Sequence, residues 1–229
     1  MSGGSFVSPE TRQRVRGWAV PVAVAMGRLG LTPNALTVIG FVGTTAAALA
    51  AASQQWLLAG VLVLAFGIFD LFDGALARAT GRASKFGAFL DSTLDRTGES
   101  LVLAGVAVGC AGADVMLGVA LAGLAATFAS VVTYTRAKAE SLGLHGEVGF
   151  APRPERLAIL SIGLVLAGAL GGVGRGEPPS ELFLQVDPVM LTGTYALMLA
   201  LGLIAILSAV TVLQRIVHVK RQLDSTDQQ

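Results

Sequence analysis

The chain has 229 residues, of which 53% are hydrophobic and only 14% are charged, and its mean hydropathy is +0.70. Soluble domains carry about 25% charged residues, so this composition excludes an ordinary soluble domain and predicts an integral membrane protein. The single cysteine, Cys110, excludes an intramolecular disulfide. The net charge is +1, and we expect no nucleic-acid partner.

Residues 1–30 are expected to form a polar tail followed by an interfacial helix. The first nine residues are small and polar and lack the apolar core of a signal peptide. Residues 10–30 mix four arginines with Trp18, valines and Met26, a pattern that predicts an amphipathic helix interrupted near Pro21. Such a helix lies on an anionic leaflet rather than crossing it.

Six apolar runs follow, and each approaches the length of about 20 residues that a transmembrane helix needs. Thr32-Pro33-Asn34 is a helix-start signal before the first run. Small residues such as Gly105 and Gly109 allow close helix packing. We therefore predict an all-α integral membrane protein with six transmembrane helices in residues 31–221 and a polar tail at 222–229. The runs are Ala35–Ala52, Trp56–Ala79, Phe89–Ala111, Val115–Ala137, Leu157–Val173 and Val189–Val212.

The basic residues predict the orientation of these six spans. Arg175 falls at one membrane face, together with Glu177, Glu181 and Asp187. The positive-inside rule places the opposite, basic face in the cytoplasm, so both termini and the active site are expected there. The residues of that basic face are Arg12, Arg14, Arg16, Arg28, Arg78, Arg82, Lys85, Arg96, Arg136, Lys138, Arg153, Arg156, Arg215, Lys220 and Arg221.

Four aspartates stand in or beside apolar segments, where an unpaired charge costs about 2.5–3.5 kcal/mol at the centre of a membrane helix. Asp70 and Asp73 share one side of a first helix, and Asp91 and Asp95 share one side of a second. Two antiparallel helices would bring all four together. Oxygen ligands without His or Cys favour Mg²⁺ or Mn²⁺, so the pattern predicts a metal-diphosphate site, with a structural salt-bridge cluster as the alternative.

These residues resemble the signature of the CDP-alcohol phosphotransferases, D-x2-D-G-x2-A-R-x8-G-x3-D-x3-D. The family consists of membrane enzymes that transfer a phosphatidyl or similar group from a CDP-linked donor to an alcohol and release CMP. The resemblance implies two divalent cations, Mg²⁺ with Mn²⁺ as an alternative, and Asp95 as the general base. The metal ligands it implies are Asp70, Asp73, Asp91 and Asp95, and the remaining signature positions are Gly74, Ala77, Arg78 and Gly87.

A second resemblance concerns the nucleotide. Thr32-Pro33-Asn34 and Thr37 are similar to the T-P-N/D-x-x-T element of the lipid-synthesising members of the family. The family resemblance implies that this element and the signature together bind CDP-diacylglycerol (CDP-DAG). The CDP-DAG-binding residues expected in this way are Asn34, Thr37, Gly74, Arg78, Ser84 and Gly87.

Basic residues outside the signature predict an anionic acceptor. Together, Tyr134–Glu140 and Pro152–Leu157 resemble stretches of the bacterial phosphatidylinositol phosphate synthases, although Lys and Arg are exchanged at 136 and 138 and Pro152 replaces an acidic residue. Several cations near a carboxylate site would bind a phosphorylated alcohol, although each could instead serve as a lipid anchor. The expected acceptor-phosphate residues are Arg136, Lys138, Arg153, Arg156 and Arg215.

The expected reaction transfers the phosphatidyl group of CDP-DAG to a hydroxyl of an inositol phosphate, giving phosphatidylinositol phosphate and CMP. The nearest alternative is a phosphatidylglycerophosphate synthase, which would use glycerol 3-phosphate. A cation transporter or channel and a lipid-binding scaffold are alternatives from other classes. The family resemblance also implies a homodimer.

Overall fold

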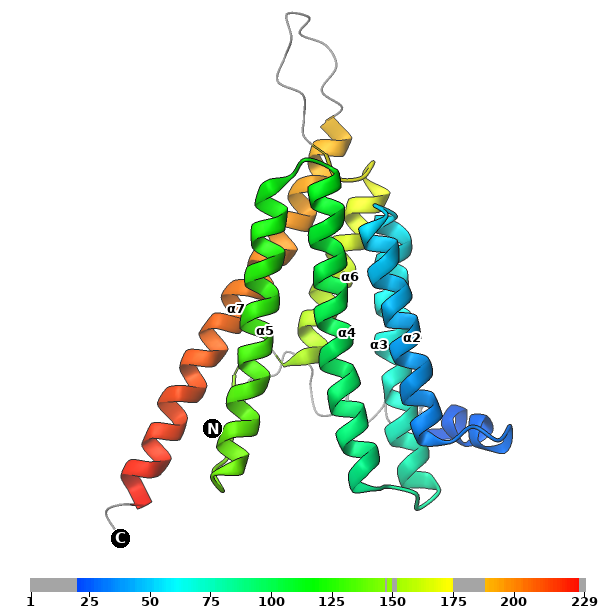
Figure 1. Cartoon of the computed structure of the whole chain (residues 1–229), viewed down its shortest axis with the longest axis vertical. Helices are drawn as coiled ribbons and strands as arrows, with labels where there is room; N and C mark the ends of the chain where they lie inside the picture. The colour runs from blue at the N-terminus through cyan, green and yellow to red at the C-terminus, as the bar shows by residue number, and fades with distance from the viewer. Residues whose placement is uncertain (1–19, 147, 150–151, 175–187, 227–229) are drawn as a thin grey trace, which may run out of the picture.

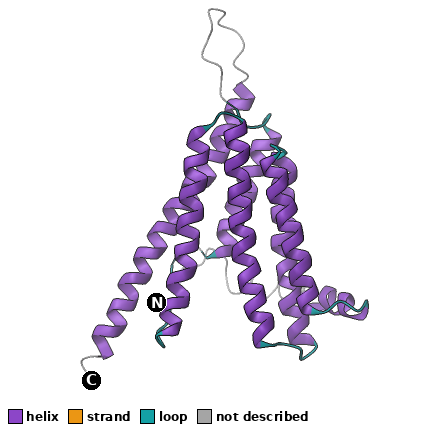
Figure 2. Ribbon diagram, viewed as in Figure 1, coloured by secondary structure: helices purple, strands orange, loops and turns teal. Residues whose placement is uncertain are grey.

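The computed structural model describes residues 20–146, 148–149, 152–174 and 188–226, and every regular element within them is a helix (Figure 2). The six long helices correspond to the six predicted apolar runs, which confirms the all-α prediction. The last helix continues to Thr226, beyond the expected boundary at residue 221. The helices are α2 (Pro33–Ala52), α3 (Trp56–Ala79), α4 (Lys85–Gly112), α5 (Met116–Ser141), α6 (Arg153–Ala169) and α7 (Pro188–Thr226).

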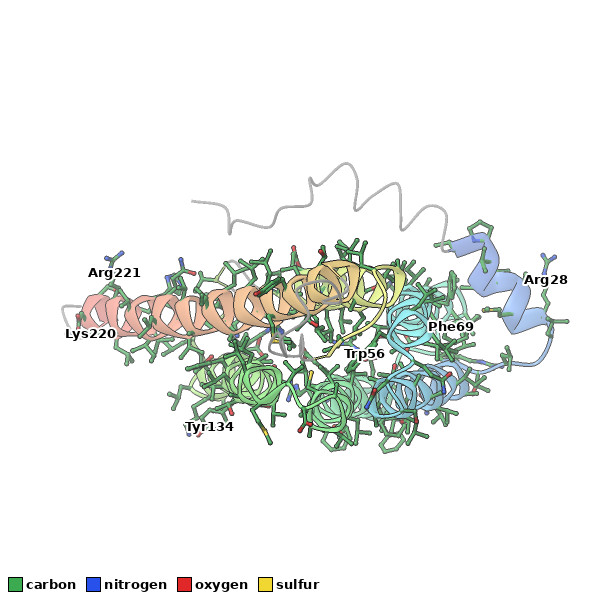
Figure 3. All side chains as sticks on the ribbon, turned by 90° about the horizontal axis from the view of Figure 1, so that it is seen from above. Arg28, Trp56, Phe69, Tyr134, Lys220 and Arg221 are labelled. Carbon is green, nitrogen blue, oxygen red and sulfur yellow. The ribbon has the colours of Figure 1, made fainter. Side chains whose placement is uncertain are left out.

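The six helices form a closed ring in two layers. Around the ring, α2 packs on α3, α3 on α6, α6 on α7, α7 on α5, α5 on α4, and α4 again on α2. Seen from above, α2, α4 and α5 make one row and α3, α6 and α7 make the other (Figure 3). Buried apolar side chains fill the space between the rows, including Trp56, Leu103, Leu164 and Leu201.

Local signals in the sequence account for the starts of α2 and α4. The Thr32 hydroxyl accepts a hydrogen bond from the Ala35 N–H at 3.2 Å, and Pro33 occupies the first turn of α2. The Ser84 hydroxyl accepts a hydrogen bond from the Gly87 N–H at 2.9 Å at the start of α4. The predicted helix start at Thr32 is confirmed.

Glycines allow α2 and α4 to approach closely. A Cβ atom at Gly105 would lie 2.2 Å from the carbonyl oxygen of Ala48, and one at Gly109 would lie 2.2 Å from that of Ala51. No side chain fits at such distances. Gly105 and Gly109, four residues apart on α4, therefore allow close packing against α2 of the same chain.

A short helix at residues 20–28 projects sideways from the bundle near the start of α2 (Figure 1). Its Ala23 is fully buried in a small apolar cluster with Leu36, Phe72 and Leu76. The interfacial helix expected at residues 10–30 coincides with it only in part, because residues 1–19 lie outside the described residues. Its amphipathic, membrane-surface character stays a prediction.

Four helices are long and apolar enough to cross a membrane: α2, α3, α5 and residues Thr192–Ser225 of α7. The other two helices fall short in apolar content or in length. Charged residues occupy the first half of α4, and α6 has only 17 residues. The chain is thus a membrane protein with four long apolar helices and two helices that are shorter or more polar.

The bundle is compact at one end and splayed at the other (Figure 1). The end of α3, the start of α4, and the ends of α5 and α7 lie at the splayed end. There α6 begins part-way up the bundle, recessed from the ends of its neighbours. All described Lys and Arg side chains of the long helices lie on the parts nearer the splayed end.

Candidate active site

The four predicted aspartates lie on α3 and α4, which run antiparallel and are joined by the turn at residues 80–84. The two helices bring them into one region, because Asp91 is within electrostatic range of both Asp70 and Asp73, and Asp95 is within range of the other three. The spacing within each helix thus produces the expected convergence.

Arg153 joins one aspartate from each helix. Its Nη1 atom donates to Oδ2 of Asp70 at 2.9 Å and to Oδ2 of Asp95 at 2.5 Å. The three side chains are only 18–24% exposed, so these contacts are partly shielded from water. Because Arg153 is the first residue of α6, the recessed start of that helix places its guanidinium at the depth of the two carboxylates.

Asp73 makes a different contact, toward α2. The Thr37 hydroxyl donates to Oδ2 of Asp73 at 2.7 Å, and both residues are buried. This bond connects the expected nucleotide-binding element of α2 directly to the aspartate signature on α3.

A groove of about 220 Å³ lies between the start of α2, the end of α3 and the start of α4. A Cβ at Gly74 would lie 3.2 Å from Nη1 of Arg78, and one at Gly87 would lie 3.1 Å from Oδ1 of Asn34. Side chains at these two glycines would therefore narrow the groove. All six expected CDP-DAG-binding residues line it, together with two aspartates: Asn34, Thr37, Gly74, Arg78, Ser84, Gly87, Asp73 and Asp91.

The expected acceptor-phosphate residues have different surroundings. Arg136 pairs with Glu140 at 2.7 Å on the exposed surface of α5, and Lys138 is exposed near the end of the same helix. Arg215 is buried and donates from Nε to the carbonyl of Val148 at 2.9 Å. It also donates from Nη1 to a carbonyl of α5, so Arg215 holds the α5–α6 loop against the bundle.

Arg156 makes a buried bidentate ion pair with Glu99. Nε and Nη2 of Arg156 donate to the two carboxylate oxygens of Glu99, both at 2.7 Å. The sequence analysis assigned no role to Glu99. Its position was a usable signal, because Glu99 follows Asp91 and Asp95 at intervals of four residues and therefore continues the same face of α4.

The donor set fits a divalent cation by its chemistry. All four side chains are carboxylates, the oxygen ligands that Mg²⁺ and Mn²⁺ prefer, and the contacts with Arg153 show that Asp70 and Asp95 attract a positively charged group. No group of three or more Asp, Glu, His or Cys among residues 20–146, 148–149, 152–174 and 188–226 is arranged to hold a metal ion as it stands. Three of the carboxylates have other contacts, since Asp70 and Asp95 accept from Arg153 and Asp73 accepts from Thr37.

Comparisons with known proteins agree with this architecture. The model of the CDP-alcohol phosphatidyltransferase family matches residues 30–219. Phosphatidylinositol phosphate synthase of Cutibacterium acnes is 38% identical over 91% of this chain and 97% of its own length. Archaetidylinositol phosphate synthase of Pyrococcus horikoshii is 34% identical over 96% of this chain and 98% of its own length.

Two solved structures of Mycobacterium tuberculosis phosphatidylinositol phosphate synthase have similar folds. The complex with manganese and citrate superimposes with a TM-score of 0.72 and 31% identity, covering 88% of both chains. The complex with CDP-DAG gives a TM-score of 0.71 and 31% identity, covering 88% of this chain and 92% of the other.

Proposed function

Because the chain belongs to the CDP-alcohol phosphatidyltransferase family and is therefore a transferase, we propose that it transfers the phosphatidyl group of CDP-DAG to an inositol phosphate hydroxyl. The products are phosphatidylinositol phosphate and CMP. One observation carries this proposal: Arg153 contacts Asp70 and Asp95 beside the groove that the six expected CDP-DAG residues line. A group that binds phosphate thus lies next to the expected general base.

In the proposed mechanism, CDP-DAG occupies the groove with its diphosphate toward the aspartates. The acceptor hydroxyl attacks the β-phosphorus, and the bond from that phosphorus to the CMP oxygen breaks. Asp95 accepts the hydroxyl proton. Asn34, Thr37 and Ser84 orient the nucleotide with hydrogen bonds, while the guanidinium of Arg78 binds a diphosphate oxygen.

Asp70, Asp73, Asp91 and Asp95 would hold two divalent cations, with Mg²⁺ proposed and Mn²⁺ as the alternative. When bound, the cations neutralise the diphosphate and stabilise the departing CMP oxygen. The oxygen-only donor set and the manganese in the M. tuberculosis structure support this assignment.

Among the five expected acceptor-phosphate residues, Arg153 is the one whose position best supports direct contact with the phosphate. Its neighbour Asp95 is the proposed base, so a phosphate bound by Arg153 would hold the acceptor beside the group that activates it. Arg136 and Lys138 are proposed to attract the acceptor at the splayed end. Arg156 and Arg215 are proposed to support the acceptor site indirectly, because Glu99 and backbone carbonyls already accept hydrogen bonds from their guanidinium groups.

The proposed membrane arrangement has six spans, with the splayed end in the cytoplasm and with residues 20–28 near the interface. In this arrangement α4 and α6 cross the membrane as parts of the ring, although each alone is less apolar or shorter than the other four. The concentration of Lys and Arg toward the splayed end supports the orientation. We also propose that the protein is a homodimer, as the family resemblance implies.

A comparison of acceptors tests the proposed reaction. Purified protein is given CDP-DAG, Mg²⁺ and, in parallel, inositol 1-phosphate, free inositol or glycerol 3-phosphate, and the lipid product is identified by mass. We expect efficient product formation with inositol 1-phosphate and little with free inositol, because Arg153 is proposed to bind the phosphate of the acceptor. Product from glycerol 3-phosphate alone would instead support a phosphatidylglycerophosphate synthase, and product from free inositol would contradict an acceptor-phosphate site.

A further inference from the structure

The buried ion pair between Glu99 and Arg156 lies next to the proposed catalytic centre but outside it. Glu99 is 6% exposed and Arg156 is 2% exposed. Two hydrogen bonds of 2.7 Å fix the planar guanidinium against the carboxylate. Two fully shielded charges are costly to bury unless they meet each other, so this pair fixes the relative position of the two helices that carry it.

The Glu99–Arg156 pair and the Asp95–Arg153 contact are two successive ion pairs between α4 and α6. Arg153 and Arg156 are three residues apart on α6, and Asp95 and Glu99 are four residues apart on α4, so each couple lies on one face of its helix. Two successive Arg–carboxylate pairs therefore connect the same faces. The Glu99 pair is buried and bidentate, whereas the Asp95 contact uses one nitrogen that Asp70 shares.

These ion pairs cross the interior of the bundle. In the ring formed by the described helices, α4 packs on α2 and α5, and α6 packs on α3 and α7. The two ion pairs therefore join two helices that are not neighbours in the ring. The N-cap of α6, Pro152, makes no side-chain hydrogen bond, and the Glu99 pair constrains the first turn of α6 together with the contacts of Arg153.

We propose that Glu99 is a positioning residue of the transfer reaction. Through Arg156 it fixes the rotation and depth of the first turn of α6, so that Arg153 reaches Asp70 and Asp95 and presents its remaining nitrogens to the acceptor phosphate. Arg156 is then a positioning residue as well. This inference rests on the proposed function, since it assigns Glu99 to the acceptor side of that same site.

The decisive variant is Glu99→Gln, because it separates this role from direct phosphate binding by Arg156. If Glu99 positions Arg153, Glu99→Gln raises the acceptor KM and lowers kcat/KM for the acceptor by about tenfold or more, because small misplacements of a positioned group are costly. The CDP-DAG KM changes less than about twofold, since the groove lies on α2, α3 and the start of α4. If Arg156 instead binds the phosphate, releasing it from Glu99 leaves the acceptor KM unchanged or lower, which overturns the proposal.

A double-mutant cycle tests whether the effect passes through Arg153. In an Arg153→Ala background, Glu99→Gln should cause little further loss, because the residue being positioned is already absent. Losses that multiply independently would overturn the proposal. Glu99→Asp, which keeps the charge, should recover part of the acceptor kcat/KM.

Two further variants serve as controls for misfolding. Glu99→Gln/Arg156→Gln removes both buried charges and leaves two amides that can hydrogen-bond; it should fold, and its acceptor kcat/KM should still be low. Asp114→Asn removes an exposed carboxylate at the far end of α4 and should behave as wild type. Wild-type acceptor kinetics in the double variant would overturn the proposal, whereas a wild-type protein that forms no lipid product would contradict the proposed function itself.

Discussion

At the scale of single residues, the site depends on contacts between groups of opposite charge. Asp95 and Asp70 share one guanidinium nitrogen of Arg153, and Asp73 accepts the hydroxyl proton of Thr37 in a hydrogen bond. Asp73 thus has different surroundings from Asp70 and Asp95 although all three belong to one signature. This difference predicts separable effects when the aspartates are replaced singly.

The first prediction concerns Asp95. Asp95→Asn keeps the shape of the side chain but cannot accept a proton, so the rate of CMP release should fall about 100-fold or more. Binding of CDP-DAG, measured by the increase it causes in thermal stability, should persist because Asp95 does not line the groove. Asp114→Asn is the matched control. Near-normal turnover of Asp95→Asn would show that another group is the base.

A second prediction concerns Asp91, which lines the groove and lies within range of Asp70 and Asp73. Asp91→Asn removes one proposed ligand charge, so the Mn²⁺ concentration for half-saturation should rise about tenfold or more. Electron paramagnetic resonance of free Mn²⁺ measures this binding without reference to activity. Unchanged Mn²⁺ affinity would exclude Asp91 as a ligand, and full turnover of the wild type in excess chelator would exclude the metal mechanism.

At the scale of elements, the lengths of the helices shape the site. Because α6 starts part-way up the bundle, its first residue reaches aspartates that lie well inside α3 and α4. The partial positive charge at the start of a helix also favours nearby carboxylates. Close packing of α2 on α4 holds the opposite side of the groove, so a change at that contact should affect stability before chemistry.

We therefore expect Gly105→Ala to destabilise the protein. Its new methyl group would lie 2.2 Å from the carbonyl oxygen of Ala48, and overpacking of this kind costs about 1–3 kcal/mol. Gly123→Ala on α5 is the control, because no atom lies within 4 Å of the new Cβ. Thermal unfolding in detergent should show a lower midpoint for Gly105→Ala than for Gly123→Ala. Equal midpoints would contradict the tight α2–α4 contact.

At the scale of the whole molecule, the charge distribution and the splayed end point to one orientation. The described Lys and Arg residues of the long helices concentrate toward the end where α3, α5 and α7 finish. With its 39 residues, α7 is about 58 Å long, well beyond the hydrocarbon thickness of about 30 Å. Lys220 and Arg221 lie on its last turns, at the far end of the helix (Figure 3), and the proposed membrane arrangement places these turns outside the hydrocarbon.

This arrangement predicts the side on which inserted reporters appear. A reporter after Gln229 and one between Gly143 and His145 should be cytoplasmic, whereas one beside Asp114, in the turn between α4 and α5, should be external. Alkaline phosphatase and fluorescent-protein fusions report the two sides. External labelling of the Gly143–His145 segment in sealed cells would reverse the proposed orientation.

Sequence alone predicted the helices and the convergence of the aspartates, because both depend on local spacing. Apolar runs mark the helices, Thr32 marks the start of α2, and the intervals within Asp70–Asp73 and Asp91–Asp95 place each couple on one helix face. The residues that line the groove were expected only from the family resemblance of two segments, because local spacing does not bring α2 beside α3 and α4.

Only the tertiary structure decided what each basic residue contacts. In the sequence, Arg153, Arg156 and Arg215 are equivalent as cations near helix ends, yet they meet the aspartates, a buried glutamate and backbone carbonyls respectively. Their partners lie 57 to 83 residues away along the chain. These pairings depend on the depth and rotation of α6 in the bundle and join residues of helices that are far apart in the sequence, which local spacing does not encode.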